Sequence, residues 1–495
     1  MSKRVYITTS IPYVNGDPHV GFALECVQAD VLARHHRLRG DEVRLQTGTD
    51  DNSLKNVEAA AAAGVPIADY VRAQAERFAA LRGPLQLSFD DFLSTSVDPR
   101  HRSGVERLWQ ACAASGDLYQ RDYKGLYCAG CEAFVAPGEL RHGLCPEHAE
   151  PPAQVAERNW FFRLSRYERE LQALIEDGRL RIEPEHRRNE ALSFIRGGLE
   201  DFSVSRTSRR ARGWGIPVPG DPSQVVYVWF DALGNYLTAL DFGTGGDAYR
   251  AWWERSDERI HVIGKGILRF HAVYWPAILL SADEPLPTAI FVHDYLTVDG
   301  EKLSKSRGNA VDPAEVADRH GADGLRWWYA RSVPRTGDVD FREDLVAARA
   351  DELADELGNL VNRTIALVGG NQPERPLVAP DGAGGLVAAV EDAPRAVGAA
   401  LYRFDIRAAA DAVWRLVTEA NRFISLARPW ELSEAERDPI LAVLLEVCCT
   451  IAVEVAPFLP EAAARIERAL ESRDPALGRQ LFPKAARSGR TGPGV

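Results

Sequence analysis

Two lysines and a serine in the segment DGEKLSKSRGN, residues 299–309, could bind a triphosphate. Lys302 and Lys305 carry ammonium groups on flexible stems, and Ser304 lies between them. Such groups can neutralise charge that develops on a leaving pyrophosphate. The segment lacks the G-x-x-x-x-G-K-[ST] pattern of a P-loop, which argues against a P-loop kinase. Taken alone, a lysine–serine loop is more often a solvated turn.

A second candidate site lies in DPHVGFALE, residues 17–25, where an apolar run ends and a helix-like stretch begins. His19 and Gly21 would lie at the start of that helix. Free backbone N–H groups and the helix dipole favour anions there. A lone H-x-G is equally compatible with an ordinary turn.

A third candidate is a cluster of cysteine and histidine residues. Cys128 and Cys131 form a C-x-x-C pair, and Cys145 and His148 form a C-x-x-H pair further along. Four such ligands with no open position predict a structural zinc site that folds a small insertion. His142 is a competing ligand, but the tighter C-x-x-H spacing favours His148. The alternative is a redox C-x-x-C pair beside an unrelated cysteine and histidine.

The elements around these candidates predict a parallel sheet. Residues 4–8 and 42–51 read as buried strands, with a helix from about Ala23 to Leu38 between them. Two more strand-like runs lie far downstream at 259–266 and 288–300, separated by a predicted helix. A βαβ opening of this kind implies a parallel sheet that is interrupted and later resumed.

The last third of the chain predicts a helical bundle. From about Leu345 the apolar residues follow helical spacing, and one predicted face carries Phe404, Val413, Leu416, Ala420 and Phe423. Residues 369–385 read as a loop between helices, and the last ten residues, from 486, as a disordered tail.

Composition narrows the class of protein. The chain has 495 residues and a formal net charge of −12, which argues against wholesale coating of nucleic acid but leaves room for a local basic face. No run approaches the roughly 18 apolar residues of a membrane span. The first residues lack a signal-peptide core, so we expect a cytoplasmic enzyme with no membrane partner. A monomer is the expected oligomeric state.

Six longer segments, in order along nearly the whole chain, carry a resemblance to one family. They are RVYITTSIPYVNGDPHVG, LQTGTDD, WGIPVPGDPSQVVYVWFDAL, HVIGKGILRFHAVYWPAILL, VHDYLTVDGEKLSKS and GNLVNRT. With the H-x-G turn, the K-L-S-K-S loop, the zinc knuckle and the helical C-terminal region, they resemble class I aminoacyl-tRNA synthetases. The match is closest to the methionyl-tRNA synthetase family.

The resemblance implies an α/β fold. A Rossmann-like catalytic domain would be split by a connective insertion with a zinc knuckle, and followed by an all-α anticodon-binding-type bundle. The implied boundaries are 1–116 and 225–344 for the catalytic halves, 117–224 for the insertion, 345–485 for the bundle and 486–495 for the tail. Such enzymes use ATP and Mg²⁺ to make an aminoacyl-adenylate, and then esterify the terminal ribose of a tRNA; a structural Zn²⁺ is implied as well.

The resemblance implies that residues in the first two candidate segments face ATP. His19 and Gly21 match the start of the family's H-x-G-H signature. The loop signature K-M-S-K-S is matched by Lys302, Ser304 and Lys305, with Leu303 in place of methionine.

The resemblance also implies where the amino acid and the tRNA bind. Asp50 matches the acid that holds the substrate ammonium, which is sensible because a buried ammonium needs a charged acceptor. The walls of the methionine pocket are matched by Ile11, Tyr13, Trp229, Ala232, Tyr236, Phe270 and His271. An aromatic slot suits a polarisable thioether, although without the family these aromatics would read as ordinary core. Asn359, Arg363 and Trp430 match the residues that read the anticodon, by base-edge hydrogen bonds and stacking.

The chain departs from the family pattern at four places. Phe22 replaces the second signature histidine, and loss of one such preorganised donor costs roughly 2.7–4 kcal/mol in other enzymes. After TGT the family has D-E-H-G, whereas this chain has Asn52 and Ser53 in place of the histidine and glycine. Gly266 stands where the family usually has aspartate, and Gly234 replaces a larger residue beside the pocket segment.

These departures leave three hypotheses for the function. The first is an adenylate-forming ligase that charges tRNA, with methionine favoured as the amino acid. The second is a recruited paralogue that activates an amino acid and transfers it to a non-tRNA acceptor in small-molecule biosynthesis. The third is an inactive tRNA- or protein-binding module, which the retention of His19, Asp50, Lys302 and Lys305 argues against.

Overall fold

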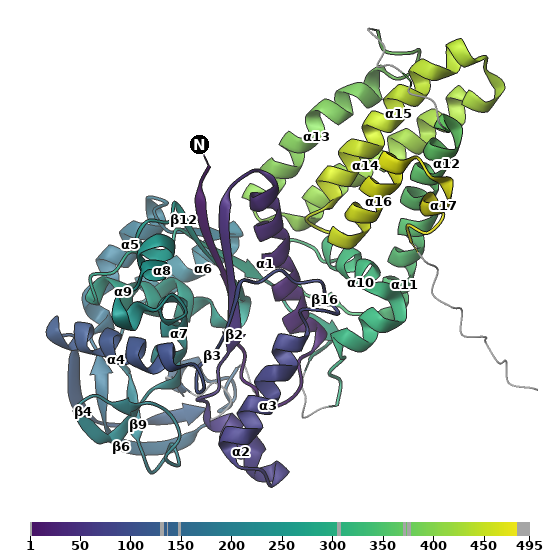
Figure 1. The fold of residues 1–495 in the computed structure, drawn as a ribbon. Helices are drawn as coiled ribbons and strands as arrows, with labels where there is room; N and C mark the ends of the chain where they lie inside the picture. The colour runs from purple at the N-terminus through teal and green to yellow at the C-terminus, as the bar shows by residue number, and fades with distance from the viewer. Residues whose placement is uncertain are drawn as a thin grey trace, which may run out of the picture. The chain divides into compact units, whose positions relative to one another are not determined.

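The computed structural model of the chain describes residues 2–128, 133–135, 137–146, 150–303, 308–369, 373 and 378–482. The chain forms two compact units (Figure 1). The sheet unit consists of Met1–Pro18, Gly40–Ala80 and Phe89–His293, and the helical unit of His19–Arg39, Leu81–Ser88 and Asp294–Val495.

The sheet unit is organised around a six-stranded sheet with the order β3-β2-β1-β12-β13-β7. All neighbouring strands in this sheet run parallel. The strands are β1 (Arg4–Thr9), β2 (Glu42–Thr49), β3 (Asp91–Ser94), β7 (Arg181–Glu183), β12 (Glu258–Gly264) and β13 (Ala289–His293). Because β1 lies between β2 and β12, the predicted parallel sheet that is interrupted and then resumed is confirmed.

Helices complete the sheet unit. They are α2 (Leu54–Ala63), α3 (Ile67–Ala80), α4 (Pro99–Ala114), α5 (Glu168–Glu176), α6 (Glu185–Arg196), α7 (Val228–Thr238), α8 (Asp247–Tyr249) and α9 (Trp275–Ser281). The helix predicted between the last two strands is broken: a wide π turn, Phe270–Tyr274, precedes α9. Pro276 lies at the start of α9 and has no N–H to give to an α-helical bond, so the wider turn occupies the point where a regular helix would fail.

The stretch predicted as a connective insertion contains two small antiparallel sheets. One has the order β5-β4-β6-β8 and the other β10-β11-β9. Their strands are β4 (Leu118–Cys128), β5 (Ala133–Val135), β6 (Ala153–Phe162), β8 (Phe202–Ser203), β9 (Ser205–Thr207), β10 (Pro217–Val218) and β11 (Asp221–Val226). Strand β7 comes from the same stretch but pairs with β13, so this part of the chain also contributes an edge to the main sheet. The predicted domain boundaries stay a prediction.

The helical unit contains α1 and most elements after residue 294. Its helices are α1 (Val20–Leu38), α10 (Pro313–Ser332), α11 (Glu343–Glu352), α12 (Asn359–Val368), α13 (Gly384–Tyr402), α14 (Ile406–Ala427), α15 (Glu434–Val455), α16 (Pro460–Ser472) and α17 (Pro475–Gly478). A small sheet has the order β15-β14-β16, from Glu301–Lys302, Leu296–Val298 and Val339–Asp340. Helices α13 to α16 pack side by side, as Figure 1 shows.

The face predicted from the sequence of α14 is buried. Val413, Leu416, Ala420 and Phe423 are all buried residues of that helix, and Phe404 is buried just before it begins. In α10, Gly321 interrupts the helical backbone with φ +77°, a left-handed conformation that suits glycine. The second half of α10 therefore has its own direction.

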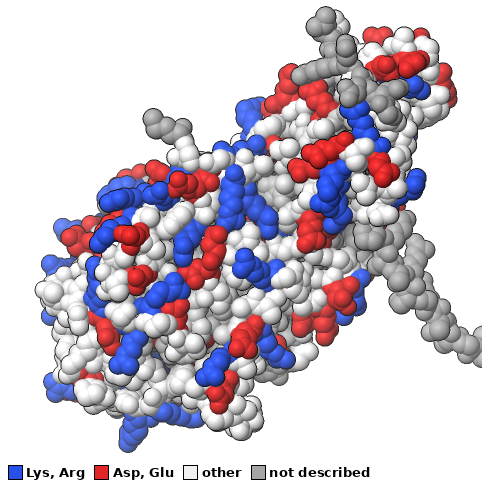
Figure 2. All heavy atoms as spheres, in the orientation of Figure 1, with Lys and Arg blue, Asp and Glu red and all other residues white. Residues whose placement is uncertain are grey.

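The charged surface is mixed. Figure 2 shows Lys and Arg side chains interspersed with Asp and Glu side chains on the face drawn. In the part of the chain that the structure describes, none of the helices is both long and apolar enough to cross a membrane.

Candidate functional site

The start of α1 is built around His19. The backbone of this N-cap residue is extended, and its Nδ1 accepts hydrogen bonds from the N–H groups of Gly21 at 3.1 Å and Phe22 at 3.4 Å. Because Nδ1 accepts, the proton of the neutral ring must be on Nε2, which remains a donor. The helix predicted from Ala23 therefore begins earlier, at Val20, because His19 caps it.

Gly21 is required by the packing of this turn. A Cβ at Gly21 would lie 3.0 Å from His19 Cε1 and 3.3 Å from Leu303 Cδ1, which is tighter than ordinary contact. The structure thus brings the two sequence-predicted ATP segments together, through Gly21 and the buried Leu303. Of the predicted loop residues, Lys302 lies in β15, while Ser304 and Lys305 lie outside the described residues.

Asp50 lies directly after β2 and is held by backbone contacts. Its side chain is buried, its N–H donates to the Pro12 carbonyl at 2.9 Å, and it forms an isolated β-bridge with Tyr13. The Asn56 amide donates to the Asp50 carbonyl at 2.9 Å, and Oδ1 of Asp50 accepts the N–H of Asn52 at 3.2 Å. A carboxylate fixed in this way is suited to accept a charge-assisted hydrogen bond from an ammonium group.

The two residues after Asp50 belong to a structural network. The Asp51 carboxylate accepts hydrogen bonds from the Ser94 hydroxyl and, at 3.1 and 2.9 Å, from the N–H and hydroxyl of Ser96. Burial raises the pKa of Asp51, although these hydrogen bonds oppose the shift. Asn52, which replaces the family histidine, donates from Nδ2 to Asp231 at 2.8 Å. The substitution therefore retains a hydrogen-bond donor toward α7.

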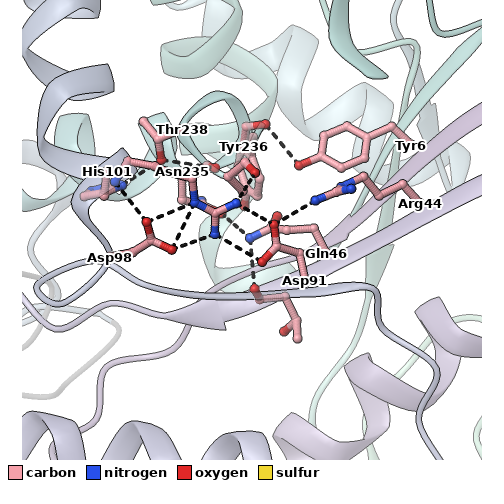
Figure 3. A network of polar contacts seen from close by, with 12 residues as sticks. Tyr6, Arg44, Gln46, Asp91, Asp98, His101, Asn235, Tyr236 and Thr238 are labelled. Atoms are coloured by element: carbon pink, nitrogen blue, oxygen red, sulfur yellow. Dashed lines mark hydrogen bonds and ion pairs between the residues drawn. The ribbon is translucent and has the colours of Figure 1, made fainter. Parts of the chain in front are cut away.

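Asp231 of α7 belongs to a network of buried polar groups. It contacts His101 Nε2, and His101 Nδ1 lies 2.8 Å from the Thr238 hydroxyl. The Gln46 side-chain amide donates to Asn235 at 3.0 Å (Figure 3). These contacts join β2, α4 and α7, so the helix that carries the predicted pocket wall is fixed by polar as well as apolar packing.

The predicted pocket wall is assembled from α7 and the π turn before α9. Trp229 and Phe270 are stacked, with ring centroids 3.7 Å apart and an interplanar angle of 6°. Both rings are half-buried, as is Ile11, whereas Ala232 is buried. The stack gives an apolar, polarisable surface of the kind that suits a thioether.

A hydrogen-bonded pair lies deeper in the same two elements. The Tyr236 hydroxyl lies 2.7 Å from His271 Nε2, and His271 Nδ1 lies 2.9 Å from the Ile267 carbonyl. A carbonyl only accepts, so His271 Nδ1 is the donor in that bond, whereas the Tyr236 hydroxyl can either donate to Nε2 or accept from it. The Tyr236 ring is 4.2 Å from His261, whose pKa burial holds well below its ordinary value, with the charges of His271 and Arg259 adding to the shift.

The two glycine departures have different surroundings. A Cβ on Gly234 would lie 3.3 Å from Val105 and 3.8 Å from Leu108, both on α4. The missing side chain at Gly234 therefore allows α7 to approach α4, and the side chain of Val105 lies beside the glycine. Gly266 is an exposed residue of the turn Lys265–Ile267.

The predicted anticodon residues gather on the helical unit. The Arg363 guanidinium lies 5.6 Å from the centroid of the Trp430 ring, and 49% of Trp430 is exposed. Asn359 is one turn before Arg363 on α12 and donates to the Asp355 carbonyl at 2.8 Å. An exposed ring beside a guanidinium, with an amide one turn away, could stack on and hydrogen-bond to unpaired bases.

The predicted zinc ligands are described only in part. Cys128 and Cys145 are both buried, while Cys131 and His148 lie outside the described residues. Within the ranges that are described, no group of three or more Cys, His, Asp or Glu side chains could hold a metal ion. Cys128 is the last residue of β4, and Cys145 follows β5 along the chain.

Sequence reasoning missed the polar support of this site. His101 and Asp231 are fully buried, yet nothing in the local pattern of α4 marks His101 as a partner of α7. Asp231 offered a weak signal, because an acid inside the apolar stretch YVWFDAL needs a partner.

Comparison with known proteins gives a consistent result. The profile of the family "tRNA synthetases class I (M)" matches residues 5–156 and 148–365. A methionine–tRNA ligase from Mycobacterium bovis is 40% identical over 480 residues, covering 94% of this chain and 91% of the relative. One from Brucella suis biovar 1 is 38% identical with the same coverage.

Solved structures agree with the sequence relatives. Mycobacterium tuberculosis methionyl-tRNA synthetase in complex with methionyl-adenylate matches with a TM-score of 0.88 at 38% identity, covering 99% of both chains. This chain therefore belongs to the class I tRNA synthetases, and within them to the family described as "tRNA synthetases class I (M)". The relatives just compared carry the names methionine–tRNA ligase and methionyl-tRNA synthetase, so the resemblance inferred from the sequence is confirmed.

Proposed function

We propose that this chain is a methionine–tRNA ligase. It would activate methionine with ATP and then transfer the methionyl group to the terminal ribose of a tRNA. The observation that carries the proposal is the match over 99% of the chain to a structure holding methionyl-adenylate, at 38% identity. A buried carboxylate at Asp50 and a stacked Trp229–Phe270 pair supply the chemistry that an α-amino acid with a thioether would need.

The reaction would proceed in two balanced steps. A carboxylate oxygen of methionine attacks the α-phosphorus of ATP, and the bond to pyrophosphate breaks. A ribose hydroxyl of the tRNA then attacks the carbonyl carbon, AMP leaves with the bridging oxygen that came from the methionine carboxylate, and the hydroxyl proton passes to the departing phosphate or to water. ATP would enter as its Mg²⁺ complex, so the metal belongs to the substrate.

Individual residues would have separate roles in the first step. Asp50 would hold the methionine ammonium, and the Nε2–H of His19 would donate to a phosphate oxygen. Lys302 and Lys305 would neutralise the departing pyrophosphate, with Ser304 as a further donor. Because charge on pyrophosphate peaks in the transition state, the lysines would act on the rate more than on ATP affinity.

The departures from the family pattern argue less strongly against a tRNA ligase once the structure is considered. Asn52 still donates toward α7, and Gly234 is explained by the approach of α4. Phe22 and Gly266 remain as changes at or near the predicted ATP site. The recruited paralogue and the inactive module are therefore not favoured over a tRNA ligase.

The proposal is tested by methionine-dependent exchange of pyrophosphate into ATP, without tRNA. Methionine, glycine and other small amino acids form the panel. We expect methionine to be the best substrate, with a slow rate, because Phe22 cannot donate to phosphate. Phe22→His should raise the rate. Exchange supported best by another amino acid, with no charging of tRNA, would instead favour the recruited paralogue.

The anticodon surface gives a prediction for the second substrate. Trp430→Ala should weaken tRNA charging by about 5- to 150-fold, since stacking of one base on an aromatic ring is worth roughly 1–3 kcal/mol. The loss should appear in kcat/KM for tRNA in the charging reaction, whereas pyrophosphate exchange, measured without tRNA, should not change. The exposed Tyr402, replaced with phenylalanine, serves as a surface control on the same unit. Equal loss of both activities would contradict an anticodon role.

The zinc knuckle is part of the proposal. Cys128, Cys131, Cys145 and His148 would hold one structural Zn²⁺, and the two described thiols are buried as such ligands usually are. We expect one equivalent of zinc in the purified protein by elemental analysis, and its loss in Cys128→Ser or Cys145→Ser. Cys112→Ser, a change at a buried thiol in α4, is the control and should keep the metal. Metal-free wild-type protein with reduced cysteines would exclude the site.

A cytoplasmic location and a monomeric state complete the proposal. Both follow from the sequence expectations above, and size-exclusion chromatography coupled to light scattering tests the second. A stable dimer at micromolar concentration would contradict the monomer.

A further inference from the structure

The second half of α10 holds a fully buried arginine that contacts three other segments of the helical unit. Arg326 has no exposed area, and its guanidinium donates to the Asp30 carboxylate at 2.8 Å and to the Leu85 carbonyl at 2.9 Å. It also donates to the carbonyls of Phe458 at 2.7 Å and Pro457 at 3.1 Å. The Arg326 guanidinium therefore joins α1, the segment 81–88 and the turn between α15 and α16.

The partner carboxylate on α1 is equally well satisfied. Asp30 Oδ1 accepts the N–H and hydroxyl of Ser88 at 2.7 and 2.6 Å, and Oδ2 accepts Nε of Arg34 at 2.7 Å. Burial alone would raise the pKa of Asp30, but the charges of Arg326 and Arg34 and the Ser88 bond outweigh it and hold the pKa below its usual range. The carboxylate stays charged and ties the middle of α1 to α10.

A second contact from α10 reaches the first turn of α1. The Tyr329 hydroxyl donates to the Val20 carbonyl at 3.0 Å, and the Val20 N–H donates to the Val311 carbonyl at 3.0 Å. Val20 directly follows His19, whose Nδ1 caps the helix. The contact with Tyr329 therefore acts one residue from the predicted phosphate donor.

Trp327, the residue after Arg326 in α10, packs on the helical bundle. Its ring centroid is 5.2 Å from that of Trp414 in α14 and 6.3 Å from that of Phe458. At the other end of α1, Arg39 pairs with the buried Glu454 of α15 at 2.5 Å. Helix α1 is thus held by the bundle at its end and, through α10, at its middle and its start.

We propose that Arg326 and Tyr329 are positioning residues for adenylate formation: through α10 they fix the start of α1, and with it His19, relative to the bundle. The inference rests on the proposed function. Asp30 is about 16 Å along the helix axis from His19, a distance over which an α-helix is stiff. A buried ion pair seldom adds much net stability, whereas its directional bonds specify one arrangement, which suits a positioning role.

The test uses the full chain with two variants that keep the packing. Tyr329→Phe removes one hydroxyl, and Arg326→Lys keeps the charge but loses the planar fork. Each has a matched control in the sheet unit. Tyr249→Phe removes a buried hydroxyl that bonds to Glu284, and Arg259→Lys alters an arginine that donates to the carbonyls of Leu286, Trp253 and Ser256.

Three quantities are measured on each protein: thermal stability, pyrophosphate exchange with separate kcat and KM values for ATP and methionine, and amide hydrogen exchange across residues 19–24. We expect Tyr329→Phe to lower kcat roughly three- to tenfold and Arg326→Lys more, with KM for methionine within about twofold. Amide exchange at the start of α1 should accelerate in both variants and in neither control.

Two results would overturn the inference. One is loss of stability with kcat and the amide exchange of residues 19–24 unchanged, which would make the contacts merely structural. The other is an equal fall of kcat in the controls, which would make the effect nonspecific. If the wild type supports no exchange with any amino acid, the proposed function fails, and faster amide exchange at residues 19–24 still decides whether α10 positions this turn.

Discussion

Replacing Asp50 with alanine is expected to lower kcat/KM for methionine in pyrophosphate exchange by about 30-fold to a few thousandfold. Removing one partner of a buried, hydrogen-bonded charge pair typically costs roughly 2–5 kcal/mol, and each 1.4 kcal/mol is a factor of ten. Asp50 is buried, and its backbone is fixed by Pro12, Tyr13 and Asn56. KM for ATP should change much less.

The adjacent carboxylate provides the control for Asp50. Asp51 is also buried, but its hydrogen bonds go to Ser94 and Ser96 and its own N–H donates to Thr95 at 2.8 Å. Asp51→Asn should therefore affect thermal stability and leave KM for methionine within about twofold. Asp50→Asn should resemble Asp50→Ala in activity, because a neutral amide cannot balance an ammonium charge. An unchanged KM for methionine in either Asp50 variant would remove it as the anchor.

The parts of the fold that the sequence predicted depend on local pattern. Residues 4–8 and 42–51 read as the two buried strands of a βαβ opening, and the structure has β1 and β2 there. The helical spacing of α14 likewise placed Val413 and Leu416 on its buried face. Periodicity carries this information because each residue's environment repeats along one element.

The parts that the sequence could not predict depend on pairs of distant residues. The contact between His101 and Asp231, and that between Asn52 and Asp231, join positions on α4, β2's end and α7. No spacing within one element encodes such a pair. A single sequence also gives no way to tell that Gly234 faces Val105 of α4.

Helix α1 illustrates the same limit at a larger scale. Its position between β1 and β2 in the sequence predicted an ordinary βαβ crossover. The structure groups it with the segment 81–88 and residues 294–495. The sequence does contain a charged residue inside an apolar stretch of each helix: Asp30 in α1 and Arg326, before WWY, in α10. Only the fold shows that these two residues form a pair.

The helix cap formed by His19 and its proposed phosphate contact can be separated by substitution. Its Nδ1 caps α1, and the tautomer this requires leaves Nε2–H as a donor. Asparagine is among the best N-cap residues, so His19→Asn should retain the cap while losing the donor. His19→Ala loses both. Both variants therefore lose the Nε2–H donor, and only His19→Ala also loses the helix cap.

Both His19 variants are expected to slow methionine-dependent pyrophosphate exchange by about 100- to 1000-fold in kcat, the usual effect of removing one preorganised donor to a transition state. Only His19→Ala should also lose stability, by about 1 kcal/mol for the missing cap, measured by chemical denaturation. Gly21→Ala is the steric control: its Cβ would lie 3.0 Å from the His19 ring, so it should slow exchange by displacing an intact donor. If His19→Asn retained the wild-type kcat, His19 would be a helix cap alone, and the phosphate contact would have to come from another residue.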